Sequence, residues 1–202
     1  MSETDNERTA LDPEKPLWDK IFTVHPLVVI GTVEEDGNHD LAPKHMAFPL
    51  GWDNYFGFVC TPRHGTYQNI KRTGEFTVSY PKPDNVLFTS LTATMRCGDD
   101  DTLPDLSPIP TFSATKIEGS FIQKAYLFFE CEKIQIIDNF GENSLILGKI
   151  IAAQAQKEYL RNASHDENDQ LYQHPLLAYI APGRFAEIKE THAFPFPEKF
   201  KK

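Results

Sequence analysis

Residues 27–48 read LVVIGTVEEDGNHDLAPKHMAF, and this stretch decides the fold. Its first part, residues 27–33, is dense in β-branched side chains, which favour a strand. The Asp-Gly pair at residues 36–37 follows, and Asp-Gly between two apolar runs is a strong hairpin signal. The return strand would cover residues 40–48. Pro43 would mark an edge, a bulge or a strand end there, because proline donates no ladder hydrogen bond.

The next residues continue this pattern of strands with short helices between them. Residues 55–60 and 76–80 are strand-like, and the polar segment at 66–73 predicts a helix. Thr66 is the candidate N-cap of that helix, and Gly74 follows its C-terminus.

The rest of the chain predicts further strands and little helix. A helix at residues 83–94 would place Val86, Leu87 and Leu91 on one face. The other expected elements are a docked helix at 17–22, a loop at 97–110, strands at 125–137 and 144–154, a polar loop with a helical turn at 159–173, and strands at 176–180 and 184–188 that end the barrel. Many strands with a few short helices indicate a mainly β, barrel-type fold.

The chain divides into one domain and two terminal segments. Residues 1–16 are polar and proline-containing, which predicts a flexible N-terminal arm. Residues 17–190 form the expected domain, and residues 191–202 form an extended C-terminal tail. A length of 202 residues suits one domain with a full core.

Composition excludes several classes of function. The net charge of −9 argues against nucleic acid and anionic membrane surfaces as partners. No apolar run approaches the roughly 20 residues of a membrane helix, and we expect no signal peptide because the N-terminus is polar and acidic. The three cysteines, Cys60, Cys97 and Cys131, are odd in number and far apart. They fit reduced thiols in a cytoplasmic protein.

The first candidate site is the start of the helix predicted after residue 60. Backbone N–H groups at a helix N-terminus beside an arginine make an anion site. Its candidate residues are Thr61, Arg63, His64, Thr66 and Asn69. The alternative is a well-capped surface helix with solvated charges, which this segment alone favours because caps are common.

The second candidate site is the proline-containing return strand. Its backbone groups would face a planar heterocycle, and Met46 and Phe48 would give apolar contact. The candidate residues are Ala42, Pro43, His45, Met46, Ala47 and Phe48. The alternative is an irregular edge strand in which His45 makes an ordinary hydrogen bond.

An ordered set of short motifs resembles the flavin reductase-like family. These are LAP at 41–43, TYQNI at 66–70, TGEFTV at 73–78, FECE at 129–132, ILGKI at 146–150 and the closing PLLAY and GRF at 175–185. Together they cover about residues 20 to 190. The resemblance implies an FMN-binding split β-barrel whose first candidate site faces the phosphate and whose second lines the isoalloxazine.

The resemblance also implies a reaction and partners. The cofactor would be FMN, with FAD compatible, and NADH or NADPH would pass hydride to the flavin N5. A homodimer with the flavin near its interface is expected, with a monooxygenase or another electron acceptor as partner. Asp40 and Lys44-His45-Met46 stand where the family often has Asn and Ser, which would change the hydrogen bonds to the ring.

Three functional classes stay open at this point. They are an NAD(P)H-dependent flavin reductase, an FMN-retaining electron carrier or reductase of another substrate, and a non-catalytic flavin-binding relative. His174 precedes the closing strand, so it either lies near the nicotinamide or ring or is a structural loop histidine. The sequence has no metal-ligand spacing among its histidines, and Asp99–Asp101 is interpreted as a solvated charge run.

Overall fold

The computed structural model describes residues 8–93, 109–162 and 166–197. Its strands are β1 (Thr23–Pro26), β2 (Val28–Val33), β3 (His39–Lys44), β4 (Ala47–Pro49), β5 (Tyr55–Cys60), β6 (Glu75–Pro81), β7 (Thr111–Ser113), β8 (Ser120–Ile122), β9 (Ala125–Phe140), β10 (Asn143–Ala155), β11 (Leu176–Ala181) and β12 (Arg184–Ile188). Its helices are α1 (Gly65–Thr73), α2 (Val86–Leu91) and α3 (Glu167–Gln173), with 3₁₀ turns η2 (Pro83–Asn85) and η3 (Lys157–Tyr159).

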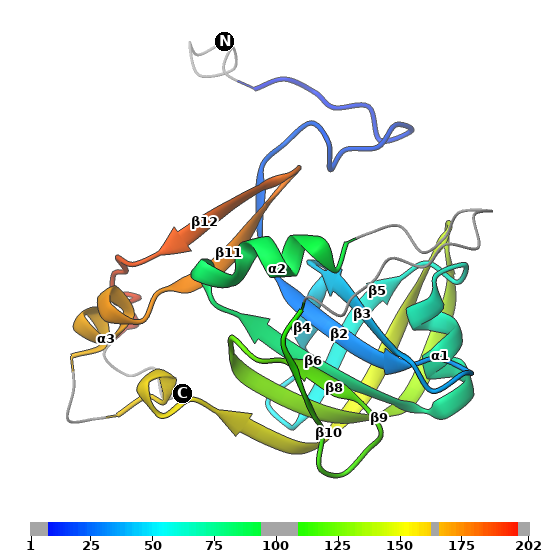
Figure 1. The fold of residues 1–202 in the computed structure, drawn as a ribbon. Helices are drawn as coiled ribbons and strands as arrows, with labels where there is room; N and C mark the ends of the chain where they lie inside the picture. The colour runs from blue at the N-terminus through cyan, green and yellow to red at the C-terminus, as the bar shows by residue number, and fades with distance from the viewer. Residues whose placement is uncertain (1–7, 94–108, 163–165, 198–202) are drawn as a thin grey trace.

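Seven antiparallel strands curl into a half-barrel in the order β3-β2-β6-β9-β10-β5-β4 (Figure 1). The predicted hairpin is confirmed: β2 pairs with β3 across the turn at Gly37, whose φ of 85° suits glycine. The mainly β split-barrel fold expected from the sequence is therefore the fold observed. Helix α1 packs on β2 and β3 at one end of this sheet.

The barrel sheet has apolar contacts on both of its faces. Inside the curl, Phe56, Phe58 and Phe76 form one cluster with Val28 and Ile30 of β2. On the other face, the short β7–β8 hairpin covers a second cluster that includes Val29 and Phe121. Strand β2 is consequently buried at all six positions, which explains why its sequence is a continuous β-branched run.

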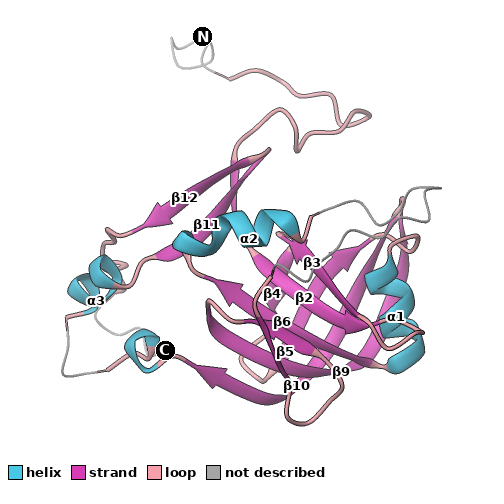
Figure 2. Cartoon of the chain, in the orientation of Figure 1, coloured by secondary structure: helices cyan, strands magenta, loops and turns pink. Residues whose placement is uncertain are grey.

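A second, smaller sheet stands apart from the barrel. Strands β1, β11 and β12 pair in the order β1-β11-β12, and the β11–β12 hairpin projects away from the seven-stranded sheet (Figure 2). The prediction that residues 176–180 and 184–188 end the barrel is wrong in this respect. Both strands form, but β11 pairs with β1, which the sequence reading missed.

Two predicted helices differ from those observed. Residues 17–22 form turns and bends without a helix, and Trp18 and Phe22 are 62% and 73% exposed. The helix expected at 83–94 is a 3₁₀ turn followed by the short α2. Its buried side carries Thr89, while Leu87 and Leu91 face outward.

The terminal segments are described only in part. Residues 8–16 and 191–197 lie outside helices and strands. Residues 94–108, which include most of the predicted loop at 97–110 together with Asp99–Asp101 and Cys97, lie outside the described residues, as do residues 1–7, 163–165 and 198–202. Among the described residues, none of the helices is long and apolar enough to cross a membrane.

Candidate functional site

The phosphate-side candidates gather where β5 ends and α1 begins. The chain leaves β5 at Cys60, and the Thr61 carbonyl accepts a 3.0 Å hydrogen bond from the His64 N–H. The helix begins at Gly65 with His64 as its N-cap. The prediction that Thr66 caps the helix is wrong, because Thr66 already lies inside the first turn and its hydroxyl donates elsewhere.

A buried polar network ties α1 to the first hairpin. The hydroxyls of Thr66 and Thr32 donate to Asp40 Oδ2 at 3.0 and 3.2 Å. The Asn69 amide donates to the Thr32 hydroxyl at 3.0 Å. All four residues are at most 6% exposed. Thr66 and Asn69 therefore hold the helix against β2 and β3, and their direct contact with a phosphate stays a prediction.

Asp40 has a definite role in this network. The sequence suggested that an aspartate at this position would alter hydrogen bonds to the flavin ring. In the structure its Oδ2 accepts hydrogen bonds from hydroxyls of β2 and α1, and its effect on hydrogen bonds to the ring stays a prediction. An ionised carboxylate is an acceptor only, so it suits a site where two hydroxyls donate.

Positive charge surrounds the start of α1. Burial lowers the pKa of His64, and the nearby Lys44 and Arg63 lower it further, against an opposing effect of Asp40. The Arg63 side chain is 69% exposed and lies 3.6 Å from Glu142. Lys44 was not among the predicted site residues, because its closeness to α1 depends on the contact between α1 and β3 rather than on local sequence.

This corner fits the phosphate of a nucleotide. The first N–H groups of a helix lack intrahelical partners, and the charges of Lys44 and Arg63 act on His64, the N-cap of this helix. A Cβ added at Gly65 would meet no atom within 4 Å, so the space beside the first turn is open. The donor set and the open approach both suit an anion.

The ring-side candidates lie on β3, β4 and the link between them. Ala42 and Pro43 sit within β3, opposite Ile30 and Val29 of β2. The expected break in the return strand falls at residues 45–46 rather than at Pro43, since β3 is an edge strand that tolerates proline. Ala47 and Phe48 then pair with Phe58 and Gly57 of β5. Met46 and Phe48 are both exposed, at 38% and 37%.

His45 connects this link to the smaller sheet. Its ring lies 4.6 Å from the ring of Tyr179 and 5.6 Å from that of His25, measured between centroids. Burial lowers the pKa of His45, and the neighbouring His25 and Lys44 lower it further. The imidazole is therefore neutral at neutral pH. His25 was not predicted to lie near the site, and Tyr179 was noted only as part of the closing PLLAY motif, because both lie on strands of the second sheet.

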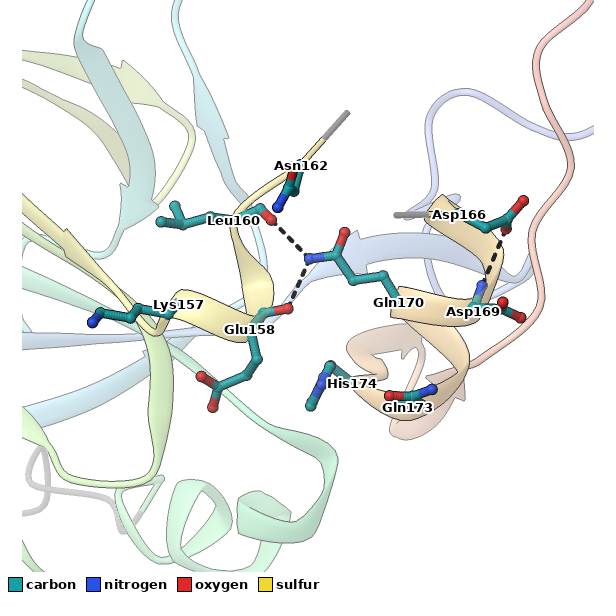
Figure 3. A pocket seen from close by; sticks show the side chains of 9 residues that line it. All are labelled: Lys157, Glu158, Leu160, Asn162, Asp166, Asp169, Gln170, Gln173 and His174. Atoms are coloured by element: carbon teal, nitrogen blue, oxygen red, sulfur yellow. Dashed lines mark hydrogen bonds between the residues drawn. The ribbon is translucent and has the colours of Figure 1, made fainter. Parts of the chain in front are cut away.

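His174 directly follows α3 and lies away from the two candidate sites, in a region formed by η3 and α3. It packs 5.6 Å from the Tyr159 ring and lines a polar pocket of about 340 Å³ (Figure 3). Across this pocket the Gln170 amide donates to the carbonyls of Glu158 and Leu160, at 2.7 and 2.8 Å. These bonds join α3 to the preceding turn, and both interpretations of His174 stay predictions.

The described residues offer no other obvious chemistry. Among them, no group of three or more His, Cys, Asp or Glu could hold a metal ion. Cys60 and Cys131 are buried free thiols, and burial raises the pKa of both.

Comparison with known proteins identifies the family of this chain. Residues 22–185 match the flavin reductase-like domain model. An uncharacterized protein of Methanothermobacter thermautotrophicus is 28% identical over 135 residues, 62% of this chain and 61% of its own length, so the chain spans about three-fifths of that relative.

Solved structures share the fold at low sequence identity. Flavoredoxin from Methanosarcina acetivorans superposes with a TM-score of 0.75 at 17% identity, over 95% of this chain and 97% of its own. Nitrilotriacetate monooxygenase component B from Bacillus cereus superposes with a TM-score of 0.75 at 16% identity, over 94% of this chain and 100% of its own. An FMN-binding protein from Thermus thermophilus, solved with 1-cyclohex-2-enone, superposes with a TM-score of 0.73 at 18% identity, over 93% of this chain and 99% of its own. Because the domain model spans most of the chain, the protein belongs to the flavin reductase-like family.

Proposed function

We propose that this chain is a flavin-dependent oxidoreductase that binds FMN and takes electrons from NADH or NADPH. The observation that carries the proposal is the group of Lys44, Arg63 and His64 at the start of α1, next to the exposed link between β3 and β4. Family membership supports a flavin as the cofactor, and the Thermus thermophilus neighbour is an FMN-binding protein by name.

Each part of the site has a distinct task in this proposal. Arg63, His64 and the first N–H groups of α1 bind the phosphate. The backbone from Ala42 to Phe48 orients the ring, with Met46 and Phe48 as apolar contacts. The network around Asp40 fixes α1 relative to β3, so the two halves of the site keep their spacing. Bound FMN supplies the redox chemistry, including the N5 atom that accepts hydride.

We further propose that the protein works as a homodimer with the flavin near the subunit interface. Exposed apolar side chains support this, among them Val24 on β1 and Leu87 on α2, each 69% exposed. A monooxygenase is one candidate electron acceptor, since the Bacillus cereus neighbour is named as a monooxygenase component.

The first test is the visible absorption spectrum of the protein after loading with FMN and desalting. Retained flavin bands that bleach on anaerobic addition of NADH or NADPH support the proposal. Retention through gel filtration favours the electron-carrier form, whereas NAD(P)H oxidation only with added free flavin favours the flavin-reductase form. Absence of both flavin retention and flavin-dependent NAD(P)H oxidation contradicts the proposal.

Arg63→Ala tests the phosphate assignment directly. We expect FMN binding to weaken by about 1.5–3 kcal/mol, the range for a hydrogen bond to a charged group. Glu142→Ala is the matched control, because it removes the carboxylate 3.6 Å from Arg63 and leaves the guanidinium in place. FMN affinity should then stay unchanged or rise slightly. Equal FMN affinity in wild type and Arg63→Ala would remove Arg63 from the site.

A further inference from the structure

Asp40 is a buried carboxylate that contacts the first turn of α1. The helix begins at Gly65, and the hydroxyl of the next residue, Thr66, donates to Asp40 Oδ2 at 3.0 Å. Burial and two nearby cations lower the pKa of the N-cap residue His64, and the negative charge of Asp40 opposes them. The carboxylate therefore lies close to the N–H groups to which the proposed function assigns the phosphate.

The phosphate corner, meaning the start of α1 with the side chains of Lys44, Arg63 and His64, has little net positive charge. His64 is neutral at neutral pH, because burial and the charges of Lys44 and Arg63 lower its pKa. The Arg63 guanidinium lies 3.6 Å from the Glu142 carboxylate. Asp40 adds a second carboxylate, so the two cations of the corner face two negative charges.

Burial makes the charge of Asp40 more effective than that of Glu142. The Glu142 side chain is 81% exposed, so water and salt screen its charge. Asp40 is 3% exposed, and a buried charge is screened much less. Asp40 also lies at the positive end of the α1 dipole, where it supplies the negative charge that a helix N-terminus favours. A bound phosphate would have to share this N-terminus with a fixed negative charge.

We propose that Asp40 is a specificity-determining residue, whose carboxylate limits the preference of the site for a flavin with a phosphate over the same flavin without one. A phosphate monoester such as FMN carries a charge of about −1.5 to −2 at neutral pH, whereas riboflavin has the same ring system and no phosphate. Repulsion from Asp40 weakens the binding of FMN and leaves that of riboflavin unaffected. The identity of the ligand as a flavin rests on the proposed function. The effect of the Asp40 charge on the start of α1 does not.

Asp138 on β9 offers a matched control for Asp40. Its Oδ1 accepts the hydroxyl of Tyr67 at 3.1 Å, so it also holds the first turn of α1. It accepts a second hydroxyl, from Ser144 at 2.6 Å. Unlike Asp40, Asp138 is not among the charged groups that shift the pKa of His64. Asparagine at either position keeps an oxygen that accepts hydroxyl hydrogen bonds and removes the charge.

The experiment compares the affinities of the full-length wild type, Asp40→Asn and Asp138→Asn for FMN and for riboflavin. Equilibrium dialysis at neutral pH, with the flavins measured by absorption, gives both affinities. We expect the ratio of FMN affinity to riboflavin affinity to rise about tenfold in Asp40→Asn, because a poorly screened repelling charge is removed. The ratio should change by less than about twofold in Asp138→Asn.

A purely structural role of Asp40 gives a different result. It predicts that both variants bind both flavins more weakly and by similar factors, since each carboxylate holds one residue of the same turn. The proposal is overturned by an unchanged or lower affinity ratio in Asp40→Asn, or by an equal rise in Asp138→Asn. If Asp40→Asn does not fold, Asp40→Ser replaces it, because serine is also neutral and keeps an oxygen acceptor.

The pKa of His64 provides a second readout that needs no flavin. Asp40 opposes the lowering of this pKa by burial and by the two cations, so Asp40→Asn should lower it further. Asp138→Asn should leave it unchanged. NMR titration of the imidazole C–H signals measures the pKa, and His64→Gln assigns the signal. A His64 pKa that Asp40→Asn leaves unchanged overturns the proposal, because the charge then does not act on the corner.

Failure of this inference can be told apart from failure of the proposed function. If the wild type binds neither flavin, the proposed function is contradicted, and the His64 titration still tests the effect of the Asp40 charge. Flavin binding with the same affinity ratio in wild type and Asp40→Asn overturns the inference and leaves the proposed function intact.

Discussion

The seven-stranded sheet and the three-stranded sheet differ in how completely they are buried. Strand β2 in the seven-stranded sheet is buried at every position, whereas β12 in the three-stranded sheet has no fully buried position. Val24 on β1 is 69% exposed, although it is a β-branched residue within a strand. The large sheet carries its own core on both faces. The small sheet does not, and it meets the barrel through His25, His45 and Tyr179.

This difference suggests that the two sheets respond unequally to substitution. The largest effect is expected in the barrel, at Gly31→Ala. An added Cβ would lie 2.3 Å from the Thr77 hydroxyl oxygen and 2.5 Å from the Ser120 carbonyl oxygen. The hydroxyl bonds that carbonyl at 2.6 Å, so the clash would also break this bond. We expect a loss of about 3 kcal/mol in unfolding free energy, measured by urea denaturation.

Gly65→Ala is the control for that substitution. No atom lies within 4 Å of a Cβ at Gly65, and alanine is the better helix former at the start of α1. Its stability should equal or slightly exceed that of wild type. A Gly31→Ala protein as stable as this control would show that the packing between β2, β6 and β8 is looser than the structure indicates.

The sequence predicted where the strands lie along the chain better than it predicted which strands pair with each other. The hairpin, β5 and the end of α1 at Gly74 follow from local signals, namely β-branched runs, an Asp-Gly turn and a left-handed glycine. The membership of β11 in a second sheet could not be predicted this way, because its partner β1 lies some 150 residues earlier in the chain. Long-range pairing leaves no local trace.

The candidate site was predictable to a similar extent. Local sequence located the start of α1 and the residues of the β3–β4 link. It could not show that Thr66 donates to Asp40, because the acceptor belongs to another element 26 residues away. The same limit applies to Lys44, which lies near the start of α1 because α1 contacts β3. Side chains whose partners are distant in sequence require the fold.

A second prediction concerns the buried carboxylate of Glu130 on β9. Burial alone would raise its pKa, but hydrogen bonds outweigh burial and hold the pKa below its ordinary value. The donors are the Thr115 hydroxyl at 2.7 Å and the N–H groups of Thr115, Lys116 and Ile117. Glu130→Gln keeps the shape and removes the charge. We expect the unfolding free energy to fall by about 2 kcal/mol at neutral pH.

The pH dependence of that loss identifies its cause. A carboxyl whose folded pKa is depressed stabilises the fold above its unfolded pKa, and this contribution disappears as pH falls through the folded pKa. The difference in unfolding free energy between wild type and Glu130→Gln should therefore be largest at neutral pH. It should become smaller below pH 4.5, the ordinary pKa of this group. A difference in unfolding free energy that stays constant from pH 7 to about pH 3 would mean that the lost acceptor oxygen, not the lost charge, destabilises the loop at 115–117.

The smallest effect on unfolding is expected in the small sheet, at Val24→Thr. Threonine keeps the shape and the β-branching of valine, and the position is 69% exposed, so the unfolding free energy of the monomer should change by less than about 0.5 kcal/mol. The proposed homodimer predicts a different result for association. If a second copy covers this face, the added hydroxyl loses water, and the dimer should dissociate about tenfold more readily.

Ile134→Thr makes the same kind of change on β9 of the barrel sheet, where the side chain is 55% exposed. Light scattering over a dilution series would compare the two variants. Weakened association in Val24→Thr alone would place the second copy on the small sheet and explain why that sheet leaves apolar residues exposed. Equal association in both variants and wild type would mean that the small sheet keeps its exposed face in the dimer. The apolar surface of β1 would then have to be explained by something other than self-association.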